Sequence, residues 1–127
     1  MIDSLKGLVQ EKTLTYAVIQ IQGIGYKVMM SINGLESISG IGNETKLLTY
    51  LHVREDILDL YGFASEKERN VFLHLIGISG IGPKLALTIL SGIEPSNLKD
   101  RVIAGDVASL TTIPGVGAKT AKRIIVE

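Results

Sequence analysis

Residues 75–90, LIGISGIGPKLALTIL, and residues 110–125, LTTIPGVGAKTAKRII, carry one pattern twice. At an offset of 35 residues, seven of the sixteen aligned pairs are identical, including both glycines of a Gly-x-Gly triplet and a lysine two places after it. Apolar residues at helical spacing surround each triplet. The repeat therefore predicts two helical hairpins in tandem, each reversing direction at its glycines.

The glycines and the lysine of each copy predict an anion site. Glycine tolerates a positive φ and lets a ligand approach the backbone closely. The first amides of the following helix lack partners within the helix, and the positive end of the helix dipole lies behind them. Such a terminus binds phosphate, and Lys84 and Lys119 stand where they can add charge. Contact with phosphates alone predicts nucleic-acid binding with little sequence preference. The alternative is a plain helical hairpin with glycine caps.

The first half of the chain has the period of β-strands. In LTYAVIQIQ, residues 14–22, Ala17, Ile19 and Ile21 share one face and alternate with Tyr16, Val18 and Gln20. Glycine turns are expected at 23–25 and 40–42. About five short strands follow from this pattern, over 2–9, 14–22, 26–32, 45–53 and 57–63. Five short strands of this length favour an OB-like barrel.

A change of period near residue 63 predicts a domain boundary. Ser65 and Glu68 have the spacing of a capping box at the start of a helical segment. Ser96 and Asp106 are the expected N-caps of two later helices. The predicted fold class is α+β by chain, with an all-β OB-fold barrel at 1–63 followed by an all-α domain of tandem helical hairpins at 64–127.

Composition narrows the chemistry. The 127 residues carry 13 Lys and Arg against 13 Asp and Glu, so bulk charge does not attract nucleic acid. No cysteine is present, which excludes disulfides, thiol catalysis and zinc–cysteine sites, and His52 and His74 alone do not suggest a metal site. An ATP-binding P-loop is not predicted, because Ala118 stands where that loop needs glycine. We predict no catalytic residue, cofactor or metal, and a cytoplasmic protein without a membrane span.

Six stretches together resemble the RuvA family of Holliday-junction-binding proteins, over essentially all of the chain. They are MIDSLKG at 1–7, GIGYKV at 23–28, HVRED at 52–56, LYGF at 60–63, GIGPKLA at 80–86 and PGVGAKTA at 114–121. The hairpin motif alone is weak evidence, since many repair enzymes carry it. The six stretches in this order are specific.

The resemblance implies an OB-fold followed by two helix-hairpin-helix motifs, in a homotetramer that holds a four-way junction open and square. Pairing of two tetramers into an octamer is left open. The resemblance assigns DNA-backbone binding to Gly80, Ile81, Gly82, Lys84, Gly115, Val116, Gly117, Lys119, Lys122 and Arg123. It also implies an acidic pin at the tetramer centre, matched by Glu55 and Asp56, whose carboxylates repel the crowded phosphates of the crossover. Without the resemblance, these two residues are ordinary turn charges.

Members of the family continue into a linker and a third helical domain that binds RuvB, the ATP-driven ring motor. The resolvase RuvC is a further implied partner. This sequence ends at Glu127, within the expected last helix of the second domain. We therefore expect junction binding and tetramer formation, but not coupling to the motor.

Three other functions stay open from the residues themselves. A single-strand-binding OB protein would stack bases on exposed rings, whereas the six aromatic residues are expected chiefly in the core. A helix-hairpin-helix repair enzyme would need a catalytic Lys/Asp pair or a carboxylate cluster, and Asp100 and Asp106 fit helix solvation and capping better. A structural assembly domain would not bind DNA.

Overall fold

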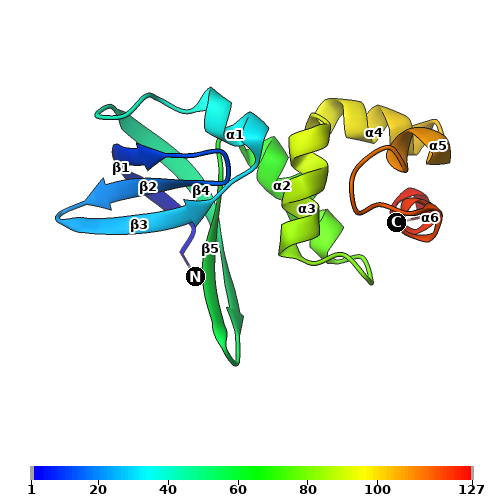
Figure 1. The fold of residues 1–127 in the computed structure, drawn as a ribbon, viewed down its shortest axis with the longest axis horizontal. Helices are drawn as coiled ribbons and strands as arrows, with labels where there is room; N and C mark the ends of the chain where they lie inside the picture. The colour runs from blue at the N-terminus through cyan, green and yellow to red at the C-terminus, as the bar shows by residue number, and fades with distance from the viewer. Residues whose placement is uncertain (1, 127) are drawn as a thin grey trace. The chain divides into compact units, whose positions relative to one another are not determined.

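Alternating apolar residues in the first half of the chain produce strands, and the helical spacing of the second half produces helices (Figure 1). The structure is a computed structural model that describes residues 2–126. The strands are β1 (Ser4–Lys12), β2 (Tyr16–Ile21), β3 (Ile24–Met29), β4 (Glu44–Arg54) and β5 (Ile57–Phe63). The helices are α1 (Ile32–Ser37), α2 (Glu66–Ile76), α3 (Pro83–Gly92), α4 (Pro95–Ile103), α5 (Val107–Leu110) and α6 (Ala118–Val126).

The strands form one closed barrel in the order β1-β2-β3-β5-β4. β1 closes it, because the strand pairs with β4 over Ser4 to Leu8 and with β2 from Leu8 onward. A β-bulge between Val9 and Glu11 bends β1 between these two partners. β3 and β5 are the one parallel pair among the neighbours within the described residues. This five-stranded barrel confirms the predicted OB-like fold.

The barrel interior is apolar, as the alternation predicts. Ala17 and Ile19 are fully buried, whereas Gln20, which follows Ile19 in β2, is exposed. The core cluster consists of Leu5, Val9, Ala17, Ile19, Val28, Met30, Leu35, Ile38 and Leu47. The first glycine turn differs from expectation: it lies at Gln22 and Gly23, whose φ values are 48° and 84°, and Gly25 belongs to β3.

α1 is a second departure, because the strand pattern predicts an extended chain to residue 32. Ser31 starts the helix instead, with its Oγ accepting a hydrogen bond from the Gly34 amide at 3.0 Å. A side-chain cap of this kind stabilises a helix by about 1 kcal/mol. The buried side of α1 adds Leu35 to the barrel core.

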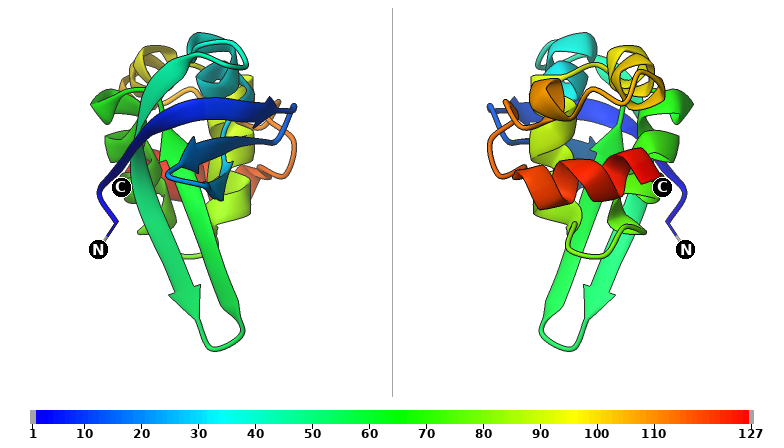
Figure 2. Two further views of the ribbon diagram at one scale, coloured as in Figure 1. Left: turned by 90° about the vertical axis from the view of Figure 1, so that its left-hand side faces the viewer. Right: turned by 90° about the vertical axis from the view of Figure 1, so that its right-hand side faces the viewer.

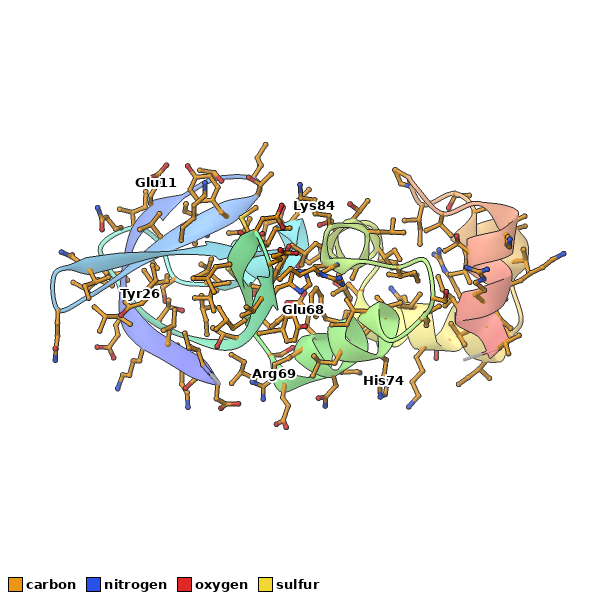
Figure 3. The ribbon with its side chains drawn as sticks, turned by 90° about the horizontal axis from the view of Figure 1, so that it is seen from below. Glu11, Tyr26, Glu68, Arg69, His74 and Lys84 are labelled. Atoms are coloured by element: carbon orange, nitrogen blue, oxygen red, sulfur yellow. The ribbon has the colours of Figure 1, made fainter. Side chains whose placement is uncertain are left out.

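The first turn of α2 is tied to the barrel by two charged side chains, Glu68 and Arg69 (Figure 3). Glu68 is buried and its Oε2 accepts a hydrogen bond from Ser31 Oγ at 2.8 Å, while Oε1 has no partner among the described residues. Burial raises the pKa of this carboxyl, against the lowering effect of hydrogen bonds from Ser31 and the Ala64 backbone. Only half of the expected capping box is present: Ser65 Oγ accepts from the Glu68 amide, but the Glu68 side chain turns to Ser31.

The chain divides into two compact units after Arg69, so the start of α2 belongs with the barrel and its end with the helical unit. In the helical unit, α6 packs against α4 and α5. Asp106 caps α5 as predicted, accepting from the Ser109 amide at 3.0 Å. Ser96 is not a cap, because Pro95 begins α4 and Glu94 precedes it. Among residues 2–126, no helix is long and apolar enough to cross a membrane.

Candidate nucleic-acid interface

The two predicted hairpins have the same backbone geometry. In the first, Ile78, Ile81 and Ala86 donate amide hydrogen bonds to the carbonyls of residues 75, 78 and 82. In the second, the residues 35 positions later make the same three bonds, at 3.2, 3.0 and 2.9 Å. Gly80 and Gly115 occupy the same place in each turn, with φ values of 91° and 84° that favour glycine. The internal repeat of the sequence is thus a repeat of structure.

The second glycine of each triplet has no structural reason to be glycine. Gly82 is the N-cap of α3 with an extended backbone, φ −96° and ψ 177°. A Cβ atom built on Gly82 or on Gly117 would meet no heavy atom of the described residues within 4 Å, its immediate chain neighbours aside. Both residues are exposed. These positions leave open space over the backbone, which is what close approach of an external ligand requires.

Amides without a hydrogen-bond partner in the described chain flank that open space. Within the described residues, the amides of Gly80, Gly82 and Lys84 donate no hydrogen bond to the chain, and Pro83 has no amide hydrogen. The amides of Gly117 and Lys119 at the start of α6 are likewise free. Unpaired amides at a helix N-terminus form a binding site for an anion.

Lysines stand beside these amides. Lys84 is the second residue of α3 and Lys119 the second residue of α6; both are exposed, and Figure 3 labels Lys84. Neither helix has an acidic residue in its first turn. A cation there opposes the helix dipole by about 0.3–1 kcal/mol. An anion bound to the amides would attract the lysine and so offset that unfavourable interaction.

Lys122 and Arg123 lie one turn further along α6 and differ from each other. Lys122 is exposed, whereas Arg123 is half-buried and donates from Nη1 to the carbonyl oxygen of Ser79 at 3.0 Å. The two side chains, with Ser79, Lys119 and Val126, line an open cleft of about 360 Å³. The structure therefore brings three of the predicted cations together at the first hairpin, and it adds a backbone carbonyl, Ser79 O, that sequence alone did not identify.

Glu55 and Asp56 form the two-residue turn of the β4–β5 hairpin, as predicted, and both are exposed. From Leu51 to Leu60, the two strands pair only with each other among the described residues. They extend as a ribbon past the end of the barrel, about 13 Å for four residues at 3.3 Å each (Figures 1 and 2). The carboxylates are thus held away from the barrel at the tip of a narrow projection.

The aromatic rings are positioned mostly for packing. Tyr61, Phe63 and Phe72 are buried. Tyr16 is half-buried, with Lys27 Nζ 4.3 Å from its ring centroid, and its hydrogen bond to Glu11, together with the charge of Glu11, raises the pKa of the Tyr16 hydroxyl. Burial, the charge of Asp59 and the neighbouring Tyr50 raise the pKa of the Tyr61 hydroxyl.

No group of three His, Asp or Glu side chains in the part of the chain that the structure describes could hold a metal ion.

Fold and hairpins together define a class of protein: an OB-like barrel followed by a tandem of helix-hairpin-helix units. The family model described as "RuvA N terminal domain" matches residues 1–62, and the model "SAM-like Helix-hairpin-helix tandem" matches residues 72–127.

Relatives named "Holliday junction branch migration complex subunit RuvA" match along the whole chain. The protein of Chloroherpeton thalassium is 52% identical over 127 residues, which are 100% of this chain and 64% of that protein. That of Acetivibrio thermocellus is 43% identical over 97% of this chain and 61% of its own length, and that of Thermoanaerobacter pseudethanolicus is 44% identical over 100% and 68%. The chain belongs to the RuvA family. It spans 61% to 68% of the length of these relatives.

Proposed function

We propose that this chain binds four-way DNA junctions through their phosphate backbone and holds them open and square for branch migration in recombination and repair. The observation that carries the proposal is the repeated hairpin, with free amides, an exposed lysine and open space over Gly82 and Gly117 in both copies. Such a surface contacts phosphates and not base edges, so binding has little sequence preference. The names of the relatives support the junction as the substrate.

The acidic tip of the β4–β5 ribbon is proposed as the pin at the crossover. Four chains would bring eight carboxylates from Glu55 and Asp56 to the point where phosphates crowd. Like charges repel, so the strands would be kept from closing on one another. Salt would weaken this repulsion, because the turn is exposed and fully open to screening ions.

Assembly and partners belong to the same proposal. The chain would form a homotetramer around the junction, with face-to-face pairing into an octamer as a second state. We propose that the RuvB ring motor supplies ATP hydrolysis and contacts a part of the protein outside this sequence. The RuvC resolvase is proposed as a further partner. We propose that this assembly acts in the cytoplasm. The chain itself would carry no catalytic residue and no cofactor.

A binding series tests the proposal. Fluorescence anisotropy with a labelled immobile junction, a duplex and a single strand of matched length is measured at fixed salt, and then from 50 to 300 mM salt. We expect the junction to bind at least tenfold more tightly than the duplex. The logarithm of the affinity should fall steeply with that of the salt concentration, since released counterions drive phosphate binding. Preference for the single strand would overturn the proposal and indicate an OB single-strand binder. Strand cleavage would instead indicate a repair enzyme, and absence of binding an assembly domain.

The pin is tested separately. Reversing both charges with Glu55→Lys and Asp56→Lys should preserve junction binding but lower the fluorescence of 2-aminopurine placed at the crossover, because attraction replaces repulsion there. The matched control reverses two other exposed acids, Glu36→Lys with Glu44→Lys. Equal fluorescence for both double variants and the unmodified chain would show that the tip does not open the crossover.

A further inference from the structure

The two helix-hairpin-helix units contact each other reciprocally through the glycines that have positive φ. A Cβ atom on Gly80 would lie 3.0 Å from Arg123 Nη1, and one on Gly115 would lie 2.9 Å from Leu85 Cδ1. Leu85 belongs to α3 and Arg123 to α6. Each hairpin turn is therefore contacted by a side chain from the second helix of the other unit.

The two contacts are chemically different. Leu85 meets its glycine through a methyl group, whereas Arg123 donates a hydrogen bond at 3.0 Å to Ser79 O, the carbonyl directly before Gly80. At the offset of 35, Thr88 stands in place of Arg123, and its hydroxyl donates to Lys84 O within its own helix. Among the described residues, a cationic side chain from the other unit therefore holds the first hairpin but not the second.

The bonded carbonyl and a free amide belong to one peptide group. In a trans peptide, the carbonyl of residue 79 and the amide of residue 80 point to opposite sides. Arg123 thus binds one side of this peptide, while the Gly80 amide on the other side has no acceptor among the described residues. Withdrawal of electron density at the carbonyl strengthens the opposite N–H as a donor.

We infer that Arg123 is a positioning residue for the first hairpin: its guanidinium fixes the Ser79–Gly80 peptide relative to α6, so that both hairpins meet the phosphate backbone together. This inference rests on the proposed DNA binding. Two linked contacts held at a fixed spacing reinforce each other, and loss of the fixed spacing removes that gain. Arg123 accordingly acts on DNA indirectly, through hairpin 80–82. Lys122 is exposed on the same helix, and its effect on DNA binding does not depend on that hairpin.

Double-mutant cycles separate positioning from direct phosphate contact. Arg123→Gln is expected to lower junction affinity about tenfold alone, but less than about twofold in either a Gly82→Ala or a Gly117→Ala background, because either glycine variant already removes the joint contact of the two hairpins. Arg123→Lys should restore part of the loss, because the ammonium can still donate to Ser79 O. Lys122→Gln is the matched control and should be additive with both glycine variants. A tenfold loss from Arg123→Gln in the Gly82→Ala background would overturn the inference.

Hydrogen exchange of the DNA-free chain gives a second test that is independent of the proposed function. Arg123→Gln should speed exchange of the Ile81 amide, which closes the first hairpin on Ile78 O, at least about fivefold relative to Lys122→Gln. The Val116 amide, which closes the second hairpin, should change much less. Equal exchange of Ile81 in both variants would overturn the positioning role even if the chain binds junctions. Failure of the unmodified chain to bind any DNA would overturn the proposed function alone.

Discussion

Gly82→Ala is expected to weaken DNA binding while leaving the stability of the fold almost unchanged. Apart from its immediate chain neighbours, the added methyl would meet no heavy atom of residues 2–126 within 4 Å, and the extended backbone at this residue suits alanine. The same methyl would occupy the space through which a phosphate reaches the free amides. Gly117→Ala tests the second hairpin in the same way, since its Cβ atom would also be unobstructed.

The magnitudes follow from these surroundings. Alanine is a poorer N-cap than glycine by up to about 1 kcal/mol, but it reduces the entropy of the unfolded chain by roughly 0.4–1 kcal/mol. The net change in the free energy of unfolding at Gly82 should therefore stay within about 0.5 kcal/mol. A hydrogen bond to a charged phosphate contributes about 1.5–3 kcal/mol, so losing one lowers affinity roughly tenfold to a hundredfold.

Thermal unfolding by circular dichroism and junction binding by anisotropy measure the two effects on the same sample. We expect Tm to move by less than about 3 °C and the affinity to fall at least about tenfold. Gly40→Ala, in an open loop of the barrel with Asn43 Nδ2 3.7 Å from the added Cβ, is the matched control and should change neither. Gly80→Ala should instead lose stability, by about 1–2 kcal/mol for its positive φ. Wild-type affinity of Gly82→Ala would refute the close approach of DNA to this backbone.

Three further outcomes concern stability. Burial raises the pKa of the Glu68 carboxyl, so the wild-type fold is most stable at low pH, where this carboxyl is protonated, and loses stability as the pH rises and the buried group ionises. Glu68→Gln removes the ionisation and should therefore stabilise the fold more at pH 7 than at pH 4. Equal gains in urea unfolding at both pH values would contradict this. Gly7→Ala should destabilise the barrel by roughly 1–3 kcal/mol, because its Cβ would overlap the backbone carbonyl oxygen of Gln20, and an unchanged urea midpoint would refute the packing. Asp106→Ala should cost about 1 kcal/mol by removing the cap on the Ser109 amide, whereas Asp106→Asn should retain most of the stability in the same measurement.

The strands and the hairpins were predictable because each depends on a local pattern. Alternation at Ala17 and Ile19 places apolar side chains on one face whichever strands pair with it. The repeated glycines specify positive φ at Gly80 and Gly115, and the structure has it at both. The spacing of Glu55 and Asp56 between two strand patterns was sufficient to place them in a turn.

Features that depend on distant residues were not predictable. α1 has only six residues and includes a glycine, so its helical pattern of apolar residues is weaker than the strand pattern before it. Ser31, which caps the helix, was the one residue whose type could have indicated a helix start there. Glu68 has the spacing of a local cap, yet its side chain pairs with Ser31, 37 positions earlier. Likewise, no local pattern distinguishes Lys122 from Arg123, and the difference arises only because Ser79 O, 44 positions away, lies within reach of the guanidinium.

The β4–β5 ribbon also has a consequence for handling the chain before it meets any partner. A projecting two-stranded ribbon exposes backbone donors and acceptors along its edges, and here it also exposes Val53, Ile57 and Leu58, which are 60%, 39% and 72% accessible. Such a segment can pair edge to edge with a neighbouring molecule and begin aggregation. The charged residues at its tip act as gatekeepers against that pairing. The carboxylates of Glu55 and Asp56 thus protect solubility, and variants that neutralise them should precipitate at lower protein concentration than variants that reverse their charge.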